Sequence, residues 1–254
     1  MGKFIDRILR NPISFEIIAI CAYSFYSLVY AIVLMPSVLL VRWSMRFLGK
    51  SIFELFVFVL ICCLSVCVFF LSAALIIGCL ERLLTLGIKP GAYPVGSVVF
   101  FRWLTYSGLH LWTVILVLQF IRCSNWIKIY LRLAGAKIGK EVFINAKDLY
   151  DPYLLEIRDN VIIGGDAFIN CHLFENGYLY LGKIILGEGV SVGAHAYVTP
   201  GTNAGKNSKI GIHTYLFRNT DISDEETFIA PPGMSIRQIA KLMRKDKAKE
   251  KKEK

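Results

Sequence analysis

The chain has 254 residues, of which 55% are hydrophobic and 19% charged, with a formal net charge of +10 and a mean hydropathy of +0.54. These values exclude a disordered chain and a purely soluble protein, because soluble domains are on average much less apolar. The seven cysteines form no CxxC pair, so the sequence indicates neither a disulfide framework nor a zinc ribbon.

Two long segments in the first part of the chain carry no formal charge. They cover residues 17–41 and 55–80, and each exceeds the roughly 20 residues that a helix needs to cross a bilayer. The first is too long for the apolar core of a signal peptide and lacks a small-residue cleavage site, so we expect it to be retained. Residues 96–122 are less uniformly apolar, and two interpretations remain open: a third span, or a helix in the membrane interface.

Composition changes near residue 122, where long apolar runs give way to glycines and short aliphatic runs. We therefore predict a membrane domain over residues 1–122, a second domain over 123–233 and a basic helix and tail over 234–254. Lys and Arg beside the spans place the second domain in the cytoplasm with either two or three spans. The tail fits attraction to anionic lipids or a solubilising role equally well, and no motif indicates nucleic-acid binding.

The most specific pattern is a hexapeptide repeat. From Leu186 the sequence divides without adjustment into LGEGVS, VGAHAY, VTPGTN, AGKNSK, IGIHTY and LFRNTD. The pattern recurs from Ile138 and from Ile157, with a shift of a single position between these blocks and an interruption at residues 175–185. Such a repeat predicts an all-β solenoid in which each hexad forms one strand and one corner, with its leading side chain inside and glycine easing the corner.

The repeat resembles the left-handed parallel β-helix of the hexapeptide-repeat acyltransferase superfamily. A closer resemblance is to the membrane-embedded C-terminal region of nonribosomal peptide synthetases such as poly-lysine synthetase. It rests on FFRWLTYSGLH at 100–110, YLRLAGAKIG at 130–139, DPYLLEIRDNVIIGG at 151–165, HLFENGYLYLGKIILGEGVSVGA at 172–194 and VTPGT at 198–202. The chain contains no adenylation or carrier domain, so a synthetase role does not transfer directly. The superfamily resemblance implies a homotrimer with sites between subunits.

The resemblance also implies transfer of an acyl group from a thioester, commonly acyl-CoA, with a histidine as general base. We expect this base to be His172, which heads the HLFENG motif and precedes the interruption at 175–185, predicted to be a loop. Glu175 is the predicted orienting carboxylate, and the neighbouring Asn176 is a candidate for binding donor or acceptor. Cys171 offers an acyl-cysteine alternative that is not favoured, because adjacent strand residues point to opposite faces.

Other candidates are weaker. His195 and His213 occupy equivalent places in hexads that are one full coil apart, so they should stack; a surface ladder is favoured over a metal shared between subunits, and no metal is expected. Further candidates for donor or acceptor binding are Arg102 and His110, in an apolar segment. Lys206, Lys209 and Arg218 suit the phosphates of coenzyme A, but a solvated basic face is the favoured interpretation of these three residues.

The sequence therefore predicts a membrane-anchored acyltransferase that modifies a hydroxyl or amine of a membrane-associated acceptor. Two alternatives stay open at this point. One is an amide-forming module like those of peptide synthetases, and the other is a non-catalytic trimeric membrane scaffold.

Overall fold

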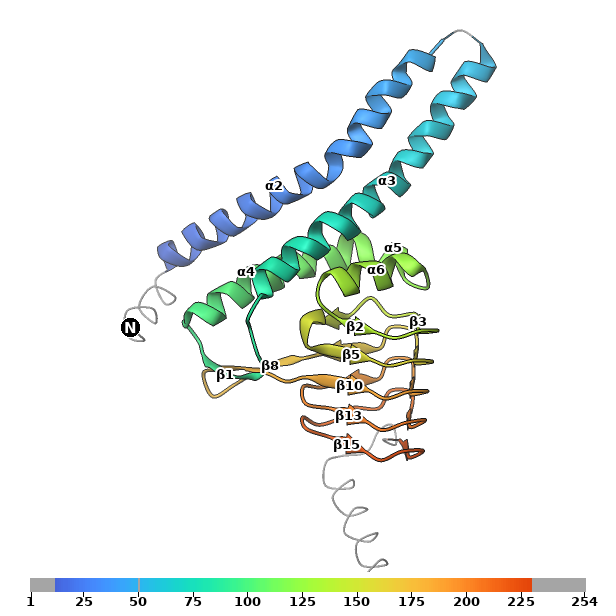
Figure 1. The fold of residues 1–254 in the computed structure, drawn as a ribbon. Coiled ribbons are helices and arrows are strands. Elements are labelled where there is room, and N and C mark those ends of the chain that lie inside the picture. Colours follow the sequence, from blue (N-terminus) through green and yellow to red (C-terminus); the bar gives the residue numbers. More distant parts are fainter. Residues whose placement is uncertain (1–11, 50, 230–254) are drawn as a thin grey trace, which may run out of the picture.

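The computed structural model describes residues 12–49 and 51–229. A layer of helices lies over one end of a stack of β-coils, and helices α2 and α3 extend away from the stack as a long hairpin (Figure 1). The α-helical elements are α2 (Pro12–Ser44), α3 (Ile52–Thr85), α4 (Val98–Thr113), α5 (Gln119–Ile121) and α6 (Asn125–Leu133). A π-helical turn, η2 (Val114–Leu118), joins α4 to α5, and two 3-10 turns are η1 (Met45–Phe47) and η3 (Pro152–Leu154).

Serine side chains mark where three of these helices begin. Ser51 forms a capping box with Glu54 at the start of α3, Ser97 accepts a hydrogen bond from the Phe100 amide of α4, and Ser124 accepts one from the Trp126 amide of α6. Each serine satisfies an amide that lacks a partner in the first helical turn. The helix boundaries are therefore encoded locally.

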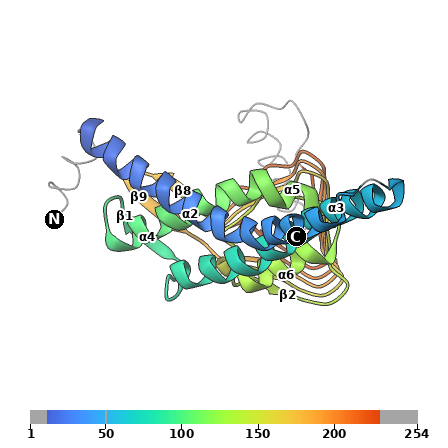
Figure 2. The same cartoon turned by 90° about the horizontal axis from the view of Figure 1, so that it is seen from above.

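Three helical segments are long and apolar enough to cross a membrane: Ala19–Phe47, Ile52–Thr85 and Val98–Ile121. The first two match the predicted spans, and the third shows that residues 96–122 also meet the length and composition of a span. Seen from above, the helices lie across the end of the coils (Figure 2). The helical layer extends beyond the predicted boundary at residue 122, because α6 packs with it.

The second part of the chain winds through three parallel sheets. The first contains β2 (Lys137–Ile138), β5 (Leu155–Ile157), β10 (Ile184–Leu186), β13 (Asn203–Ala204) and β15 (Asp221–Ile222). The second contains β3 (Phe143–Ile144), β6 (Ile162–Ile163), β11 (Ser191–Val192), β14 (Lys209–Ile210) and β16 (Thr227–Phe228). The third contains β4 (Leu149–Tyr150), β7 (Phe168–Asn170) and β12 (Tyr197–Val198).

The strand register reproduces the predicted repeat. Ile185 in β10 pairs with Asn203 in β13, a separation of exactly three hexads along the chain. Lys137 and Glu156 pair at a separation one position longer than three hexads, as the shift between the upstream blocks requires. The separation between Glu156 and Ile185 is longer still, because it also contains the interruption at 175–185. The extra residues of the interruption therefore leave the coil, and the strands on either side of them still pair in register.

The corners differ from the predicted role of glycine. Positive φ angles fall at the fourth place of each hexad from residue 186 onward, at Gly189, His195, Gly201, Asn207, His213 and Asn219. The second-place glycines serve close packing of the coils instead. A Cβ atom on Gly193 would lie only 2.5 Å from the backbone nitrogen of Ile212. Where glycine occupies the second place, as at Gly193, contact with the next coil leaves no room for a side chain.

The interruption at residues 175–185 is a hairpin and not the predicted loop. β8 (His172–Glu175) and β9 (Tyr178–Leu181) pair antiparallel, and β1 (Gly91–Pro94) adds a third strand beside β9. Asn176 and Gly177 form the tight turn between β8 and β9 with φ angles of 50° and 80°, the combination that a type I′ hairpin turn requires. The hairpin places β9 beside the chain that leads into α4, with the His172 strand on the other side of β9.

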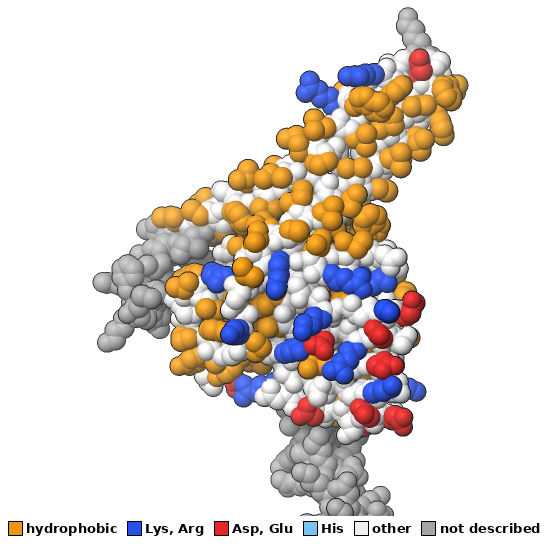
Figure 3. Space-filling model, in the orientation of Figure 1, with side chains coloured by type: hydrophobic (Ala, Val, Ile, Leu, Met, Phe, Trp, Pro, Cys, Tyr) orange, Lys and Arg blue, Asp and Glu red, His pale blue; other side chains and the backbone are white. Residues whose placement is uncertain are grey.

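The surface differs between the helical hairpin and the coils. Hydrophobic side chains cover the α2–α3 hairpin, whereas charged side chains lie over the coils and at the tip of the hairpin (Figure 3). The predicted basic helix and tail, residues 234–254, lie outside the described residues.

Two adjacent residues of β6 provide a stability test of the coil. Ile163 is fully buried in the core, whereas Ile162 is 51% exposed. We expect Ile163→Ala to lower the free energy of unfolding by about 2–5 kcal/mol, because it removes core contacts and leaves a cavity. Ile162→Ala should cost less than about 1 kcal/mol. Thermal unfolding in detergent compares the two, and equal losses would contradict the inward orientation of Ile163.

Candidate active site

A histidine and a carboxylate pair just beyond the ends of β4 and β7 in the third parallel sheet. His172 Nδ1 lies 2.6 Å from Asp151 Oδ2. The Asp151 side chain is 1% exposed and that of His172 is 17% exposed. Because a carboxylate oxygen accepts, Nδ1 carries the proton of this hydrogen bond and Nε2 is the ring nitrogen left for proton transfer. This arrangement is that of a general base with an orienting acid.

Helix α4 holds the carboxylate in place. Trp103 Nε1 donates to Asp151 Oδ1 over 2.8 Å, so the two carboxylate oxygens have different donors. The backbone amide of Asp151 donates to the Tyr106 hydroxyl over 3.0 Å. Asp151 has a φ of 58°, a conformation in which aspartate is enriched among residues other than glycine.

Aromatic rings surround the imidazole of His172. The Trp103 ring lies edge-on to it at 4.7 Å between centroids, and Tyr150 and Phe174 lie at 6.2 and 6.4 Å. The histidine borders a cavity of about 250 Å³ that is lined by Asn170, His172, Leu173, Phe174, Tyr197, Thr199, Pro200 and Tyr215. A second cavity of about 400 Å³ shares Leu173 and Pro200 with the first and includes Arg218. A small group at the first cavity would meet the exposed edge of the imidazole.

No family model matches the chain. Over 159 residues it is 31% identical to the delta-poly-L-ornithine synthetase of Acinetobacter baumannii, an alignment that covers 63% of this chain and 12% of the synthetase. It is 29% identical over 110 residues to the galactoside O-acetyltransferase of Escherichia coli, covering 40% of this chain and 53% of that enzyme. The relatives found include two proteins named as acetyltransferases and a poly-ornithine synthetase.

A solved galactoside acetyltransferase in complex with coenzyme A aligns with a TM-score of 0.43 at 16% identity, covering 56% of this chain and 84% of that one. The sequence matches to the synthetase and the acetyltransferase confirm the predicted resemblance. The chain spans only about an eighth of the synthetase and half of the acetyltransferase.

The carboxylate that contacts His172 is Asp151 and not the predicted Glu175. Glu175 is exposed and forms an ion pair with Arg218 at 2.6 Å. The physical reason is strand geometry: His172 and Glu175 are separated by an odd number of positions on one strand and so point to opposite faces. Asp151 begins the DPYLLEIRDNVIIGG segment that carries part of the resemblance, which was the available signal for it.

Two predicted binding residues in α4 make internal contacts. The Arg102 guanidinium donates to the carbonyl oxygens of Leu84 and Leu86 at the end of α3, which lack partners in a helix terminus. His110 is completely buried, so a bound donor or acceptor does not reach its ring in this structure. Both residues connect α4 to neighbouring parts of the chain.

The remaining predicted residues lie on the hairpin and the coils. Asn176 occupies the hairpin turn. Lys206 pairs with Glu188 at 3.1 Å, Lys209 is an exposed residue of β14, and Arg218 also lies over the Tyr180 ring. Of these, only Arg218 lines one of the two cavities beside His172.

His195 and His213 stack as predicted, with ring centroids 5.0 Å apart and ring planes within 6°. Both occupy corners with positive φ, where histidine is among the favoured residue types. Within residues 12–49 and 51–229, no three His, Cys, Asp or Glu side chains are grouped to hold a metal ion.

Cys171 is buried next to His172 in the chain. Its burial, together with the nearby Asp151 carboxylate, raises the pKa of its thiol well above the usual value. A raised pKa depletes the reactive thiolate at neutral pH. We expect N-ethylmaleimide at neutral pH to modify the exposed Cys123 much faster than Cys171, as measured by peptide mass spectrometry. Faster modification of Cys171 would revive the acyl-cysteine alternative.

Proposed function

We propose that the chain is an acyltransferase that moves an acyl group from a thioester such as acyl-CoA to a hydroxyl or amine, with His172 as general base. The observation that carries the proposal is the Asp151–His172 pair beside a cavity. The acetyltransferases among the sequence relatives support the reaction class. We further propose that the coils have the left-handed sense of the hexapeptide-repeat superfamily.

In the proposed mechanism, Nε2 of His172 removes the proton from the acceptor as its oxygen or nitrogen attacks the thioester carbonyl. Asp151 holds the ring orientation through Nδ1 and balances the charge of the imidazolium. The tetrahedral intermediate then breaks its C–S bond, and the imidazolium returns the proton to the leaving thiolate. The thioester becomes an ester or amide, and the free thiol is the second product.

The two cavities suggest how the substrates are divided. The cavity beside His172 has an aromatic wall suited to an acyl group and the reacting end of the acceptor. The adjoining cavity contains Arg218, whose charge suits a phosphate of the donor. Binding there would compete with the Arg218–Glu175 ion pair. Lys206 and Lys209 remain proposed contacts for phosphates along the coil surface.

The proposed acceptor is membrane-associated. Three candidate spans support a membrane anchor, and the distribution of Lys and Arg supports a cytoplasmic position for the coils. We propose a homotrimer as the assembly, by analogy with the resembling superfamily. Light scattering of the detergent-solubilised protein tests this, since a monomeric mass would contradict it.

A second candidate function is amide formation on a carrier-bound or adenylated donor. It is favoured by the alignment with the poly-ornithine synthetase, which covers more of this chain than the alignment with the galactoside acetyltransferase. The same His172–Asp151 pair would then deprotonate an amine. The alternatives differ in the acceptor, and a non-catalytic scaffold requires neither residue.

Untargeted mass spectrometry of lipids and glycans tests the proposal in membranes from cells with the wild-type protein, a deletion and His172→Ala. We expect a mass difference equal to an acyl group to disappear in both mutants, because loss of a general base costs about 100- to 10,000-fold in rate. His195→Ala is the matched control and should retain the product. A profile that changes in the deletion but not in His172→Ala would exclude His172 as the base.

Two carboxylate substitutions test which acid supports His172. Asp151→Asn should lower product formation at least about 100-fold, since the amide no longer balances the imidazolium or selects its tautomer. Glu175→Gln breaks only an exposed ion pair, so we expect a change of less than about threefold. Initial rates in membranes with matched protein levels compare them. A larger loss for Glu175→Gln would restore the original assignment.

A further inference from the structure

Three side chains on one face of α4 form hydrogen bonds with the short segment that contains Asp151. Trp103 donates to the carboxylate and Tyr106 accepts from the Asp151 amide. One turn further, His110 Nε2 lies 3.0 Å from the carbonyl oxygen of Leu149. Residues at these spacings share one face of a helix. Residues 149–151 are thus held by hydrogen bonds at the Asp151 carboxylate, the Asp151 amide and the Leu149 carbonyl.

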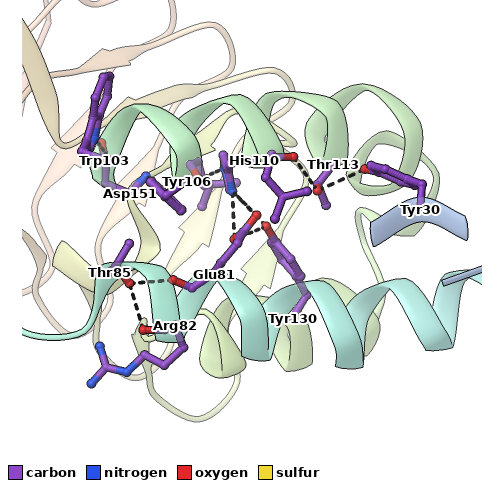
Figure 4. Close-up of polar contacts among 12 residues, drawn as sticks. Tyr30, Glu81, Arg82, Thr85, Trp103, Tyr106, His110, Thr113, Tyr130 and Asp151 are labelled. Atoms are coloured by element: carbon purple, nitrogen blue, oxygen red, sulfur yellow. Dashed lines mark hydrogen bonds and ion pairs between the residues drawn. The ribbon is translucent and has the colours of Figure 1, made fainter. Parts of the chain in front are cut away.

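Behind His110 lies a buried polar cluster that the proposed reaction does not use. Glu81 projects from α3 toward the ring of His110, and the Tyr130 side chain from α6 lies beside both (Figure 4). His110 Nδ1 is 3.2 Å from Glu81 Oε2 and 2.8 Å from the Tyr130 hydroxyl. The Tyr130 hydroxyl donates to Glu81 over 2.6 Å. The cluster joins three helices around one ring.

The hydrogen bonds of the cluster restrict where its protons lie. The Leu149 carbonyl only accepts, so Nε2 of His110 carries a proton. With Glu81 as a carboxylate that accepts from Tyr130, Nδ1 also carries a proton to bond with the carboxylate and the phenol oxygen. In that state His110 is an imidazolium paired with the Glu81 carboxylate. Both side chains are fully buried, where each ion is tolerated only with its partner in place.

We propose that Glu81, Tyr106 and His110 are positioning residues for Asp151, so that the membrane helices set the geometry of the Asp151–His172 pair. The Glu81–His110 ion pair fixes α4 against α3. With α4 fixed, Tyr106 and His110 hold the two peptide groups on either side of Tyr150. The role as positioning for catalysis rests on the proposed function, whereas the effect on the hydrogen bond of His172 does not.

A pair of tyrosine substitutions isolates the positioning contact. Tyr106→Phe removes only the hydroxyl that accepts from the Asp151 amide. Tyr153→Phe is the matched control, because its ring lies 5.7 Å from that of Tyr106 and its buried hydroxyl makes no hydrogen bond within the described part of the chain. Both variants delete one hydroxyl oxygen, from two rings that contact each other.

The readout is nitrogen-15 NMR of histidine-labelled, detergent-solubilised full-length protein, recorded where the His172 ring is neutral and assigned with His172→Ala. Wild type and Tyr153→Phe should show His172 in the Nδ1–H form with a proton signal shifted downfield by the carboxylate. In Tyr106→Phe we expect this signal to be lost and the Nε2–H form to appear, because Asp151 is no longer held. An unchanged His172 signal in Tyr106→Phe would overturn the proposal.

Glu81→Gln extends the test to the ion pair while keeping the shape of the side chain. We expect the same loss of the His172 Nδ1–H signal at a temperature at which thermal unfolding shows that the protein remains folded. A retained signal in Glu81→Gln would remove the Glu81–His110 pair from the positioning role. If the signals change as expected but wild-type membranes contain no acyl product that depends on His172, positioning stands and the proposed function fails.

Discussion

The arrangement of helices, coils and hairpin depends on the Asp151 carboxylate, which accepts two hydrogen bonds from different parts of the chain. One oxygen receives the indole N–H of Trp103 from α4, and the other receives the imidazole N–H of His172 from the β8–β9 hairpin. The first donor lies on a long apolar helix, and the second lies on a short antiparallel insertion in the coils. Because the carboxylate is almost completely buried, losing either donor would leave a charge insufficiently compensated. Helix, coil and hairpin are therefore mutually constrained at one side chain.

The coils suit this task because their geometry leaves little freedom. Each turn must repeat after three hexads, and the second-place glycines let neighbouring turns approach within backbone contact. The hairpin leaves the stack between β7 and β10, where the chain passes from the third parallel sheet back to the first. The hairpin then takes its register from Asn176 and Gly177 and from pairing with β1. Its position beside α4 follows from the coil it interrupts and from the strand it pairs with.

The hexads predicted the parallel coils, their register shift and the stacking of His195 on His213, since all of these follow from a fixed period. Three-dimensional contacts between distant segments were not predictable in this way. Asp151 and His172 are on neighbouring coils, and their approach depends on where the chain leaves the repeat. The Glu175 assignment failed because proximity in sequence was preferred to strand alternation. The Asn176–Gly177 pair was a recognisable hairpin signal, but the interruption was interpreted as a loop.

The buried Glu81–His110 pair gives the helical layer a role beyond anchoring. A helix that only tethered the coils would need an apolar face and no ionisable group, because a buried ion pair must recover the desolvation of both partners. Here the pair links α3 to α4, Tyr130 adds α6, and the second nitrogen of His110 continues to the Leu149 carbonyl. The polar contacts then run from the candidate spans to the backbone that carries Asp151. Movement of α4 along α3 would have to break this buried pair or displace the carboxylate beside His172, so the helices and the site behave as one mechanical unit.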